Sequence, residues 1–186
     1  MRRTNAVSSD AMEVVLRLLT PENSIACRIS LATGLRISDV LNLKTRHLGM
    51  TSFVLYEAKT GKRRRVTIPV NLRAAAMSYS GKVYVFPHRY DEMRHRTRQA
   101  VWRDINRAAK ALRLPGCVAP HSMRKTFARR KYAACGDMRA VQRLLNHSSE
   151  AVTALYVLAD EVHCRSSMDG LSRVKSGKRT EPAREH

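Results

Sequence analysis

Four side chains with the chemistry to handle a phosphate lie in one stretch of the sequence, namely His121, Arg124, His147 and Tyr156. His121 and Arg124 follow directly after Pro120. Because proline is favoured in the first turn of a helix, we expect both side chains to leave the same face of that turn. A helix N-terminus offers unpaired backbone N–H groups, and a guanidinium can hold two oxygens of one anion. The spacing therefore predicts a phosphate-binding site at the start of this helix.

The other two groups are positioned by the segments that follow. Asp137 is predicted to cap a short helix that ends at Asn146, with apolar residues at core spacing between them. His147 then lies in the next turn. Tyr156 lies in a last helix, capped by one of the two serines after His147. Taken alone, Tyr156 is typical of a tyrosine at the margin of a core; together with the other groups it is a candidate nucleophile.

These residues resemble the catalytic domain of the tyrosine recombinases, the phage-integrase family. HSMR, from His121 to Arg124, is similar to the family's H-x-x-R, and LLNHSS with Tyr156 nine residues after His147 is similar to its L-G-H-S pattern and tyrosine. The sequence departs from the pattern at Asn146, where the family usually has glycine. Since asparagine tolerates the left-handed backbone conformation, we expect the turn to be kept.

Two upstream segments extend the resemblance. ATGLRISDVLNL, residues 32–43, is similar to the family's first-arginine motif, T-G-x-R-x-s-E/D-l-l-x-L. AKTGKRRRVTIP, residues 58–69, is similar to its catalytic-lysine hairpin. The four motifs stand in the family's order and cover about residues 10–160.

The resemblance implies a set of catalytic residues: Arg36, Lys59, His121, Arg124, His147 and the nucleophile Tyr156. The two arginines would offset the charge that develops on a phosphodiester under attack, and His147 would hydrogen-bond the phosphate. His121 would accept the phenolic proton, and Lys59 would protonate the departing 5′-oxygen, with Lys62 as the fallback for this acid. The product is a 3′-phosphotyrosine. The resemblance also implies that the reaction needs no metal and no cofactor.

Further residues are predicted to support the site. Asp39 comes one helical turn after Arg36 and is predicted to hold its guanidinium, with a plain surface ion pair as the alternative. Basic residues of the hairpin tip, the next loop and the first helical turn are predicted to bind DNA, namely Lys62, Arg63, Arg64, Arg65, Arg96, Arg98 and Lys125. A solvated basic tip is the alternative for the hairpin residues.

The elements that position these residues indicate a mainly α-helical fold with a small three-stranded antiparallel sheet, the tyrosine recombinase catalytic-domain fold. Residues 52–58 and 65–70 alternate in β-forming residues and predict a hairpin around Lys59. Residues 81–86 predict the third strand. Residues 88–98 lack an apolar period and predict a loop near DNA.

Composition agrees with a polyanionic partner. The chain has 186 residues, with 35 Lys and Arg against 15 Asp and Glu, a net charge of +20 and a pI near 10.9. This excess favours nucleic acid over an anionic membrane. No apolar run approaches the length of a membrane span, and the first ten residues lack the apolar core of a signal peptide. The cysteines, Cys27, Cys117, Cys135 and Cys164, are too far apart to suggest zinc. We therefore expect a reduced, cytoplasmic, DNA-associated protein encoded by a bacterium, an archaeon or a phage.

The domain organisation predicted is an N-terminal extension over residues 1–9, a catalytic domain over residues 10–165 and a partly disordered tail over residues 166–186. Most members of the family carry a separate N-terminal core-binding domain, so the chain is either a minimal recombinase or a fragment.

The partner implied is double-stranded DNA with specific recombination sites, with possible accessory DNA-bending proteins. We expect a monomer in free solution and a tetramer on DNA. Two alternatives stay open, a type IB topoisomerase that relaxes DNA and a DNA-binding protein that has lost catalysis.

Overall fold

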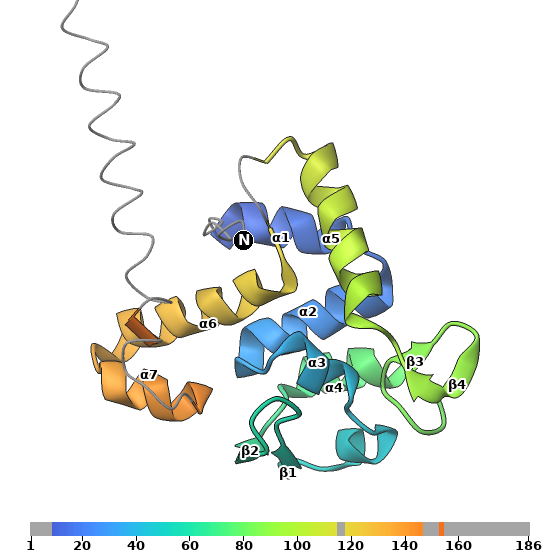
Figure 1. Cartoon of the computed structure of the whole chain (residues 1–186), viewed down its shortest axis with the longest axis horizontal. Helices are drawn as coiled ribbons and strands as arrows, with labels where there is room; N and C mark the ends of the chain where they lie inside the picture. The colour runs from blue at the N-terminus through green and yellow to red at the C-terminus, as the bar shows by residue number, and fades with distance from the viewer. Residues whose placement is uncertain (1–8, 115–117, 147–152, 155–186) are drawn as a thin grey trace, which may run out of the picture.

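The computed structural model describes residues 9–114, 118–146 and 153–154, and in these residues the chain is mainly helical (Figure 1). The longer helices are α1 (Ser9–Arg17), α2 (Pro21–Thr33), α4 (Val70–Met77), α5 (Arg98–Ala111), α6 (Pro120–Cys135) and α7 (Met138–Leu145). The short helices are α3 (Ile37–Leu41) and η1 (Thr45–Gly49). The strands are β1 (Phe53–Tyr56), β2 (Arg63–Val66), β3 (Pro87–His88) and β4 (Asp91–His95). None of the helices described is long and apolar enough to cross a membrane.

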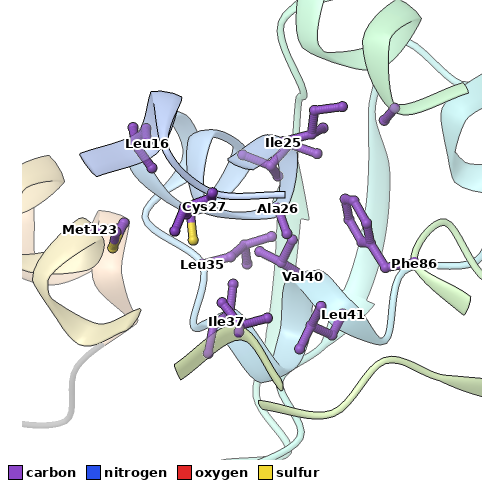
Figure 2. Close-up of a cluster of buried hydrophobic side chains, with 14 of the residues drawn as sticks. Leu16, Ile25, Ala26, Cys27, Leu35, Ile37, Val40, Leu41, Phe86 and Met123 are labelled. Carbon is purple, nitrogen blue, oxygen red and sulfur yellow. The ribbon is translucent and has the colours of Figure 1, made fainter. Parts of the chain in front are cut away.

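Helix α2 runs through the middle of the molecule and contacts α1, α3, α4 and α6 (Figure 1). Neighbours on several sides leave it little exposed surface, and its Ala26, Cys27 and Ile29 are completely buried. Side chains from α1, α3 and the segment before β3 complete this core, among them Leu16, Val40 and Phe86 (Figure 2). Helix α2 is therefore the central element of the core, and its buried position fixes where the residues after its C-terminal end lie.

Helix α2 ends at a glycine, Gly34, whose backbone conformation and close packing both favour this residue type. Gly34 has a φ of 69°, in the left-handed region, and its N–H donates to the Ser30 carbonyl at 2.8 Å. A Cβ at this position would lie 2.5 Å from the Phe127 ring of α6. Gly34 thus turns the chain out of α2 and lets α6 pack directly against the end of that helix.

The sheet differs from the predicted three-stranded one. Strands β1 and β2 form the predicted antiparallel hairpin, with Phe53 opposite Val66, but β3 and β4 form a second, separate pair. The segment predicted as the third strand makes only an isolated bridge, between Tyr84 and Lys44. Its Val85 and Phe86 are both buried in the helical core, so it packs there instead of extending the hairpin.

Strand β4 lies where the sequence predicts a loop, within residues 88–98. Its sequence, DEMRH, has no apolar face, and four of its five residues are exposed. Backbone pairing with β3 holds the strand, and such pairing leaves no hydrophobic pattern in a sequence. The loop prediction is therefore wrong for this stretch.

Side-chain caps begin helices α5 and α7, and the cap at Asp137 is the one predicted from the sequence. The Thr97 hydroxyl accepts from the Ala100 N–H at 3.2 Å at the start of α5, and the Asp137 carboxylate accepts from the Arg139 N–H at 2.8 Å at the start of α7. Helix α7 ends at Asn146, which has a φ of 57°. This is the left-handed conformation that we expected asparagine to adopt where the family usually has glycine. A small apolar cluster, Phe127, Ala128, Val141 and Leu145, joins α6 to α7.

Candidate active site

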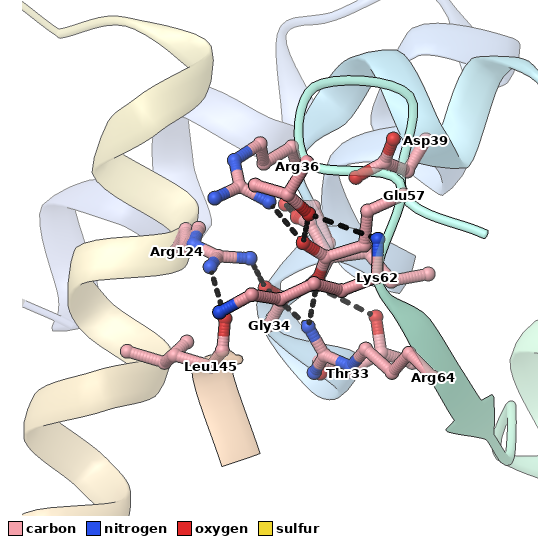
Figure 3. Close-up of polar contacts among 12 residues, drawn as sticks. Thr33, Gly34, Arg36, Asp39, Glu57, Lys62, Arg64, Arg124 and Leu145 are labelled. Carbon is pink, nitrogen blue, oxygen red and sulfur yellow. Dashed lines mark hydrogen bonds and ion pairs between the residues drawn. The ribbon is translucent and has the colours of Figure 1, made fainter. Parts of the chain in front are cut away.

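Arg36 lies at the junction between α2 and α3, where extended backbone precedes the first turn of α3. Its side chain is 19% exposed. Its Nη1 donates to Oε2 of Glu57 at 2.5 Å (Figure 3). This contact joins the α2–α3 junction to the end of strand β1.

Glu57, the partner of Arg36, was not singled out from the sequence. The residue is 1% exposed, follows directly after β1, and also accepts from the Thr60 hydroxyl at 2.9 Å. Burial would raise its pKa, but the hydrogen bonds from Thr60 and Arg36, with the charges of Arg36 and Arg124, hold the pKa of Glu57 below its ordinary value. The carboxylate is therefore ionised at neutral pH. The signal that could have found it is strand alternation, since Glu57 falls on the buried face of the strand with Phe53 and Leu55.

Arg64 does not project from the hairpin into solvent as its predicted DNA-binding role requires. Its side chain is 10% exposed. Its Nη2 donates to the Thr33 carbonyl at 2.5 Å, and its Nη1 lies 3.4 Å from Oε1 of Glu57 (Figure 3). Since these contacts use the C-terminal end of α2, we correct the prediction for Arg64: it braces the hairpin against α2.

The remaining predicted DNA-binding residues fall into two groups. Arg96 is turned inward, with its guanidinium 3.3 Å from Glu22 and 3.1 Å from the side-chain oxygen of Asn23, which also argues against a DNA contact. The others are exposed or half-buried at the surface of the hairpin, α5 and α6, namely Lys62, Arg63, Arg65, Arg98 and Lys125.

Arg124 is 1% exposed and connects three of the predicted motifs. From helix α6 its Nη1 donates to the Gly34 carbonyl at 2.6 Å, and its Nη2 donates to the Leu145 carbonyl at 2.5 Å (Figure 3). Both acceptors lie at C-terminal ends of helices, where carbonyl groups lack partners within the helix. Arg124 therefore fixes the end of α7, the residues that lead into His147, relative to the α2–α3 junction and Arg36.

Lys59 lies in the turn between β1 and β2 and is exposed. Backbone bonds close this turn: Gly61 N–H donates to the Glu57 carbonyl at 2.8 Å, and Glu57 N–H donates to the Lys62 carbonyl at 3.0 Å. Gly61 has a φ of 64°, which a glycine adopts without strain. The same residue that pairs with Arg36 thus anchors the turn that carries Lys59.

His121 is the second residue of α6, and the residue as a whole is exposed. Surrounding protein nevertheless removes part of its hydration, and this desolvation, with the charges of Arg124, Lys125, Arg36 and Lys59, lowers the pKa of His121 to about 4. The imidazole is therefore neutral at neutral pH, and one of its ring nitrogens can accept a proton. The charges that act on it come from both arginine motifs and from the lysine turn.

Asp39 does not hold Arg36, contrary to the prediction. Its Oδ1 accepts from the Ala58 N–H at 2.9 Å, which ties α3 to the residue before Lys59. Its Oδ2 is buried and has no hydrogen-bond partner among the residues described. Burial raises the pKa of Asp39, and the nearby charge of Glu57 raises it further. Glu57 has the role that the sequence assigned to Asp39, because it reaches Arg36 from the hairpin.

In the structure Arg124 donates to the Gly34 carbonyl, two residues before Arg36, and the charges of Arg36, Lys59 and Arg124 act on His121. These are four of the six predicted catalytic residues, and they come from three separate segments. His147 and Tyr156 lie outside the described residues. Arginine, lysine and neutral imidazole groups in one place can bind an anion, offset added negative charge and move protons. Within the described ranges, no three His, Cys, Asp or Glu side chains gather as metal ligands.

The chain is similar to known sequences that share the predicted motifs' family. Residues 5–163 match the family model described as the phage integrase family. A probable integrase/recombinase of Bacillus subtilis, YoeC, is 31% identical over 144 residues, which cover 73% of this chain and 76% of that protein. A tyrosine recombinase XerC of Nitrobacter winogradskyi is 33% identical over 143 residues, which cover 69% of this chain and 43% of that protein. The chain therefore spans less than half the length of this XerC.

Solved structures share the fold at lower identity. The XerA recombinase superposes with a TM-score of 0.69 at 23% identity, over 94% of this chain and 66% of that one. A lambda integrase dimer bound to a COC′ core site gives a TM-score of 0.70 at 19% identity, over 84% of this chain and 48% of that one. The post-cleavage complex of XerH bound to a palindromic difH substrate gives a TM-score of 0.70 at 17% identity. The match covers 90% of this chain and 53% of that one.

Proposed function

The chain belongs to the phage integrase family, and from this premise we propose that it is a site-specific DNA recombinase that cuts and rejoins DNA through a 3′-phosphotyrosine on Tyr156. The observation that carries the proposal is that Arg124 donates to the carbonyl of Gly34, two residues before Arg36, while the charges of both arginines act on the neutral imidazole of His121. The family's fold supports it, and the matching motif order adds His147 and Tyr156.

The two arginines would stabilise the negative charge that makes a phosphodiester resistant to attack. A phosphodiester is already anionic, and attack on phosphorus concentrates more charge on its non-bridging oxygens. Guanidinium groups offset this charge best when they are held in place before the reaction, because little reorganisation is then needed. Glu57 holds Arg36, and the Gly34 and Leu145 carbonyls hold Arg124.

Cleavage is one displacement at phosphorus, accompanied by two proton transfers. The Tyr156 phenolic oxygen forms a bond to phosphorus as the bond from phosphorus to the 5′-oxygen breaks. The phenolic proton passes to the neutral ring of His121, and Lys59 gives a proton to the departing 5′-oxygen. His147 donates a hydrogen bond to the phosphate. The phosphotyrosine bond retains the energy of the phosphodiester, so a 5′-hydroxyl of a new partner strand reverses the step.

We further propose double-stranded DNA carrying specific recombination sites as the substrate. A net charge of +20 supports binding to the phosphate backbone. The exposed or half-buried cations Lys62, Arg63, Arg65, Arg98 and Lys125 supply contacts around the site. Among the solved structures with this fold, XerH is bound to a palindromic difH substrate and lambda integrase to a COC′ core site.

Exchange of strands between two duplexes needs four cuts, and so we propose a monomer in free solution that assembles as a tetramer on DNA, with accessory DNA-bending proteins as possible partners. Light scattering without DNA and with a two-site duplex tests this assembly. A stable tetramer without DNA would contradict it.

Supercoiled plasmid with and without candidate recombination sites tests the proposed function. Site-dependent exchange of strands is the expected result. Relaxation without exchange would instead indicate a type IB topoisomerase. Binding without any cleavage would indicate a protein that has lost catalysis.

A further inference from the structure

We propose that Glu57 is a positioning residue for DNA cleavage, which holds the Arg36 guanidinium and the turn carrying Lys59 as one unit. This inference rests on the proposed function and adds to it a residue that belongs to none of the motifs read from the sequence. The contacts, the burial and the charge of Glu57 each support it.

The contacts fix one side of the Arg36 guanidinium. Nη1 lies 2.5 Å from Oε2 of Glu57, whose side chain is completely buried, whereas the Arg36 side chain keeps 19% exposure. A guanidinium has five N–H donors in a plane. Among the residues described, Arg36 donates only through Nη1, and only to Glu57. A carboxylate that holds one edge of the group orients its other donors, which can then contact a phosphate.

The same carboxylate organises the lysine turn. Oε2 also accepts from the Thr60 hydroxyl at 2.9 Å, and the Glu57 backbone accepts from the Gly61 N–H at 2.8 Å. Lys59 lies between these residues. A change at Glu57 therefore acts on the adjacent Lys59 turn and also on Arg36, which lies 21 residues earlier in the sequence.

The charge of Glu57 explains how the arginines can lie so close to each other. Arg64 lies 3.4 Å from Oε1 of Glu57 and Arg36 lies 2.5 Å from Oε2, so one buried carboxylate lies between two guanidinium groups. Arg124 contributes a third positive charge, which also acts on Glu57. Without the carboxylate, mutual repulsion would push the Arg36 side chain toward solvent and away from the position that a shared phosphate requires.

The test compares Glu57→Gln with a matched control, Glu13→Gln. Glu13 is also a carboxylate paired with an arginine, 2.7 Å and 2.9 Å from Arg28, but its pair joins α1 to α2. On a nicked suicide substrate under single-turnover conditions, Glu57→Gln should slow adduct formation by about 10-fold or more, the range expected when charge stabilisation is disturbed. Half-site affinity should change by less than about threefold, and Glu13→Gln should cleave within about twofold of the wild type.

A double variant and a modified substrate separate positioning from a general loss of structure. If Glu57 acts through Arg36, adding Glu57→Gln to Arg36→Ala should slow cleavage by no more than about twofold further. A methylphosphonate at the scissile position removes one non-bridging negative charge, so it should reduce the penalty of Glu57→Gln relative to the wild type by about fivefold or more. A merely destabilised protein would lose activity equally on both substrates.

The outcomes distinguish this inference from the function on which it rests. A wild type that forms no adduct contradicts the recombinase proposal itself. If the wild type cleaves and Glu57→Gln cleaves equally well, only the role of Glu57 is overturned. The same holds if the effects of Glu57→Gln and Arg36→Ala on the cleavage rate are fully additive in the double variant. If Glu57→Gln fails to fold, Thr60→Val tests the same point, since it removes one hydrogen bond to Oε2 at an exposed position. It should slow cleavage by about threefold or more, and normal cleavage would overturn the proposal.

Discussion

The buried carboxylate of Glu57 lies 2.5 Å from the guanidinium of Arg36. This pair joins the end of a central helix to a hairpin that follows it in the sequence, and it places a negative charge within a cluster of positive ones. An arginine that is both held and partly exposed suits the binding of an anion, because its orientation is set before the anion arrives. Residues that act on the phosphate and residues that hold the site together should therefore respond differently to substitution.

Arg36 and Arg63 should behave differently although both are arginines near the same hairpin. Arg36→Ala should slow single-turnover cleavage by about 100-fold or more, because it removes a donor to developing charge. Arg63→Ala, at an exposed position of β2, should leave cleavage of bound DNA nearly unchanged. Arg63→Ala should weaken binding and reduce its salt dependence. Equal effects of the two variants on cleavage would make Arg36 an ordinary phosphate contact.

Arg64→Ala should destabilise the protein by about 2 kcal/mol, because it leaves the Thr33 carbonyl and one oxygen of the Glu57 carboxylate without a partner. Its neighbour on the opposite face of the strand, Arg65, is exposed and bonds only to the Ser52 hydroxyl among the described residues. Arg65→Ala should therefore change the free energy of unfolding little. Urea denaturation of both variants checks this, and equal stabilities would contradict the bracing role of Arg64.

Gly34→Ala should be more destabilising than Gly136→Ala, although both glycines have a φ near 65°. A Cβ at Gly136 has no atom within 4 Å, so that variant should cost only the strain of the backbone, about 1 kcal/mol. At Gly34 the added carbon would collide with the Phe127 ring, which should raise the total cost to about 3 kcal/mol. Thermal and urea unfolding measure the difference. Equal losses would mean that α6 does not pack on Gly34 as described.

His121 should make the protein less stable in mild acid. Its pKa in the folded protein is lowered to about 4, by desolvation first and by neighbouring cations second. Between its ordinary pKa of about 6.5 and pH 4 the unfolded chain binds a proton that the folded protein does not, so the free energy of unfolding falls as the pH falls through this window. His121→Asn should remove this contribution. Urea denaturation at about pH 7 and about pH 5 should show a smaller loss for the variant. Equal losses would contradict the lowered pKa.

Sequence motifs predicted the helix ends that position Arg124, but not the contacts that hold it and Arg36. The spacing of His121 and Arg124 after Pro120 indicated a helix start, and Asn146 indicated a left-handed turn after the next helix; the structure has both. Glu57 was missed because the sequence alone does not say which groups face a carboxylate. Period-two alternation would have placed it on the buried face, where a charge must be paired.

The remaining differences have physical reasons of the same kind. Arg64 shares the inward face of β2 with Val66, a relationship that is hidden when four basic residues are read as one exposed tip. The predicted third strand contains Val85 and Phe86, which are β-forming residues but fill the helical core instead. Strand β4 is held by backbone pairing and carries no apolar pattern to predict it.

The most direct test of the account is covalent trapping with Tyr156→Phe. The substitution removes only the phenolic oxygen, so DNA binding should be retained while the protein–DNA adduct on a nicked suicide substrate disappears. The wild type should form an adduct that is linked to the DNA 3′-end and survives denaturation. An adduct of normal yield in Tyr156→Phe would contradict the assignment of the nucleophile and the mechanism built on it.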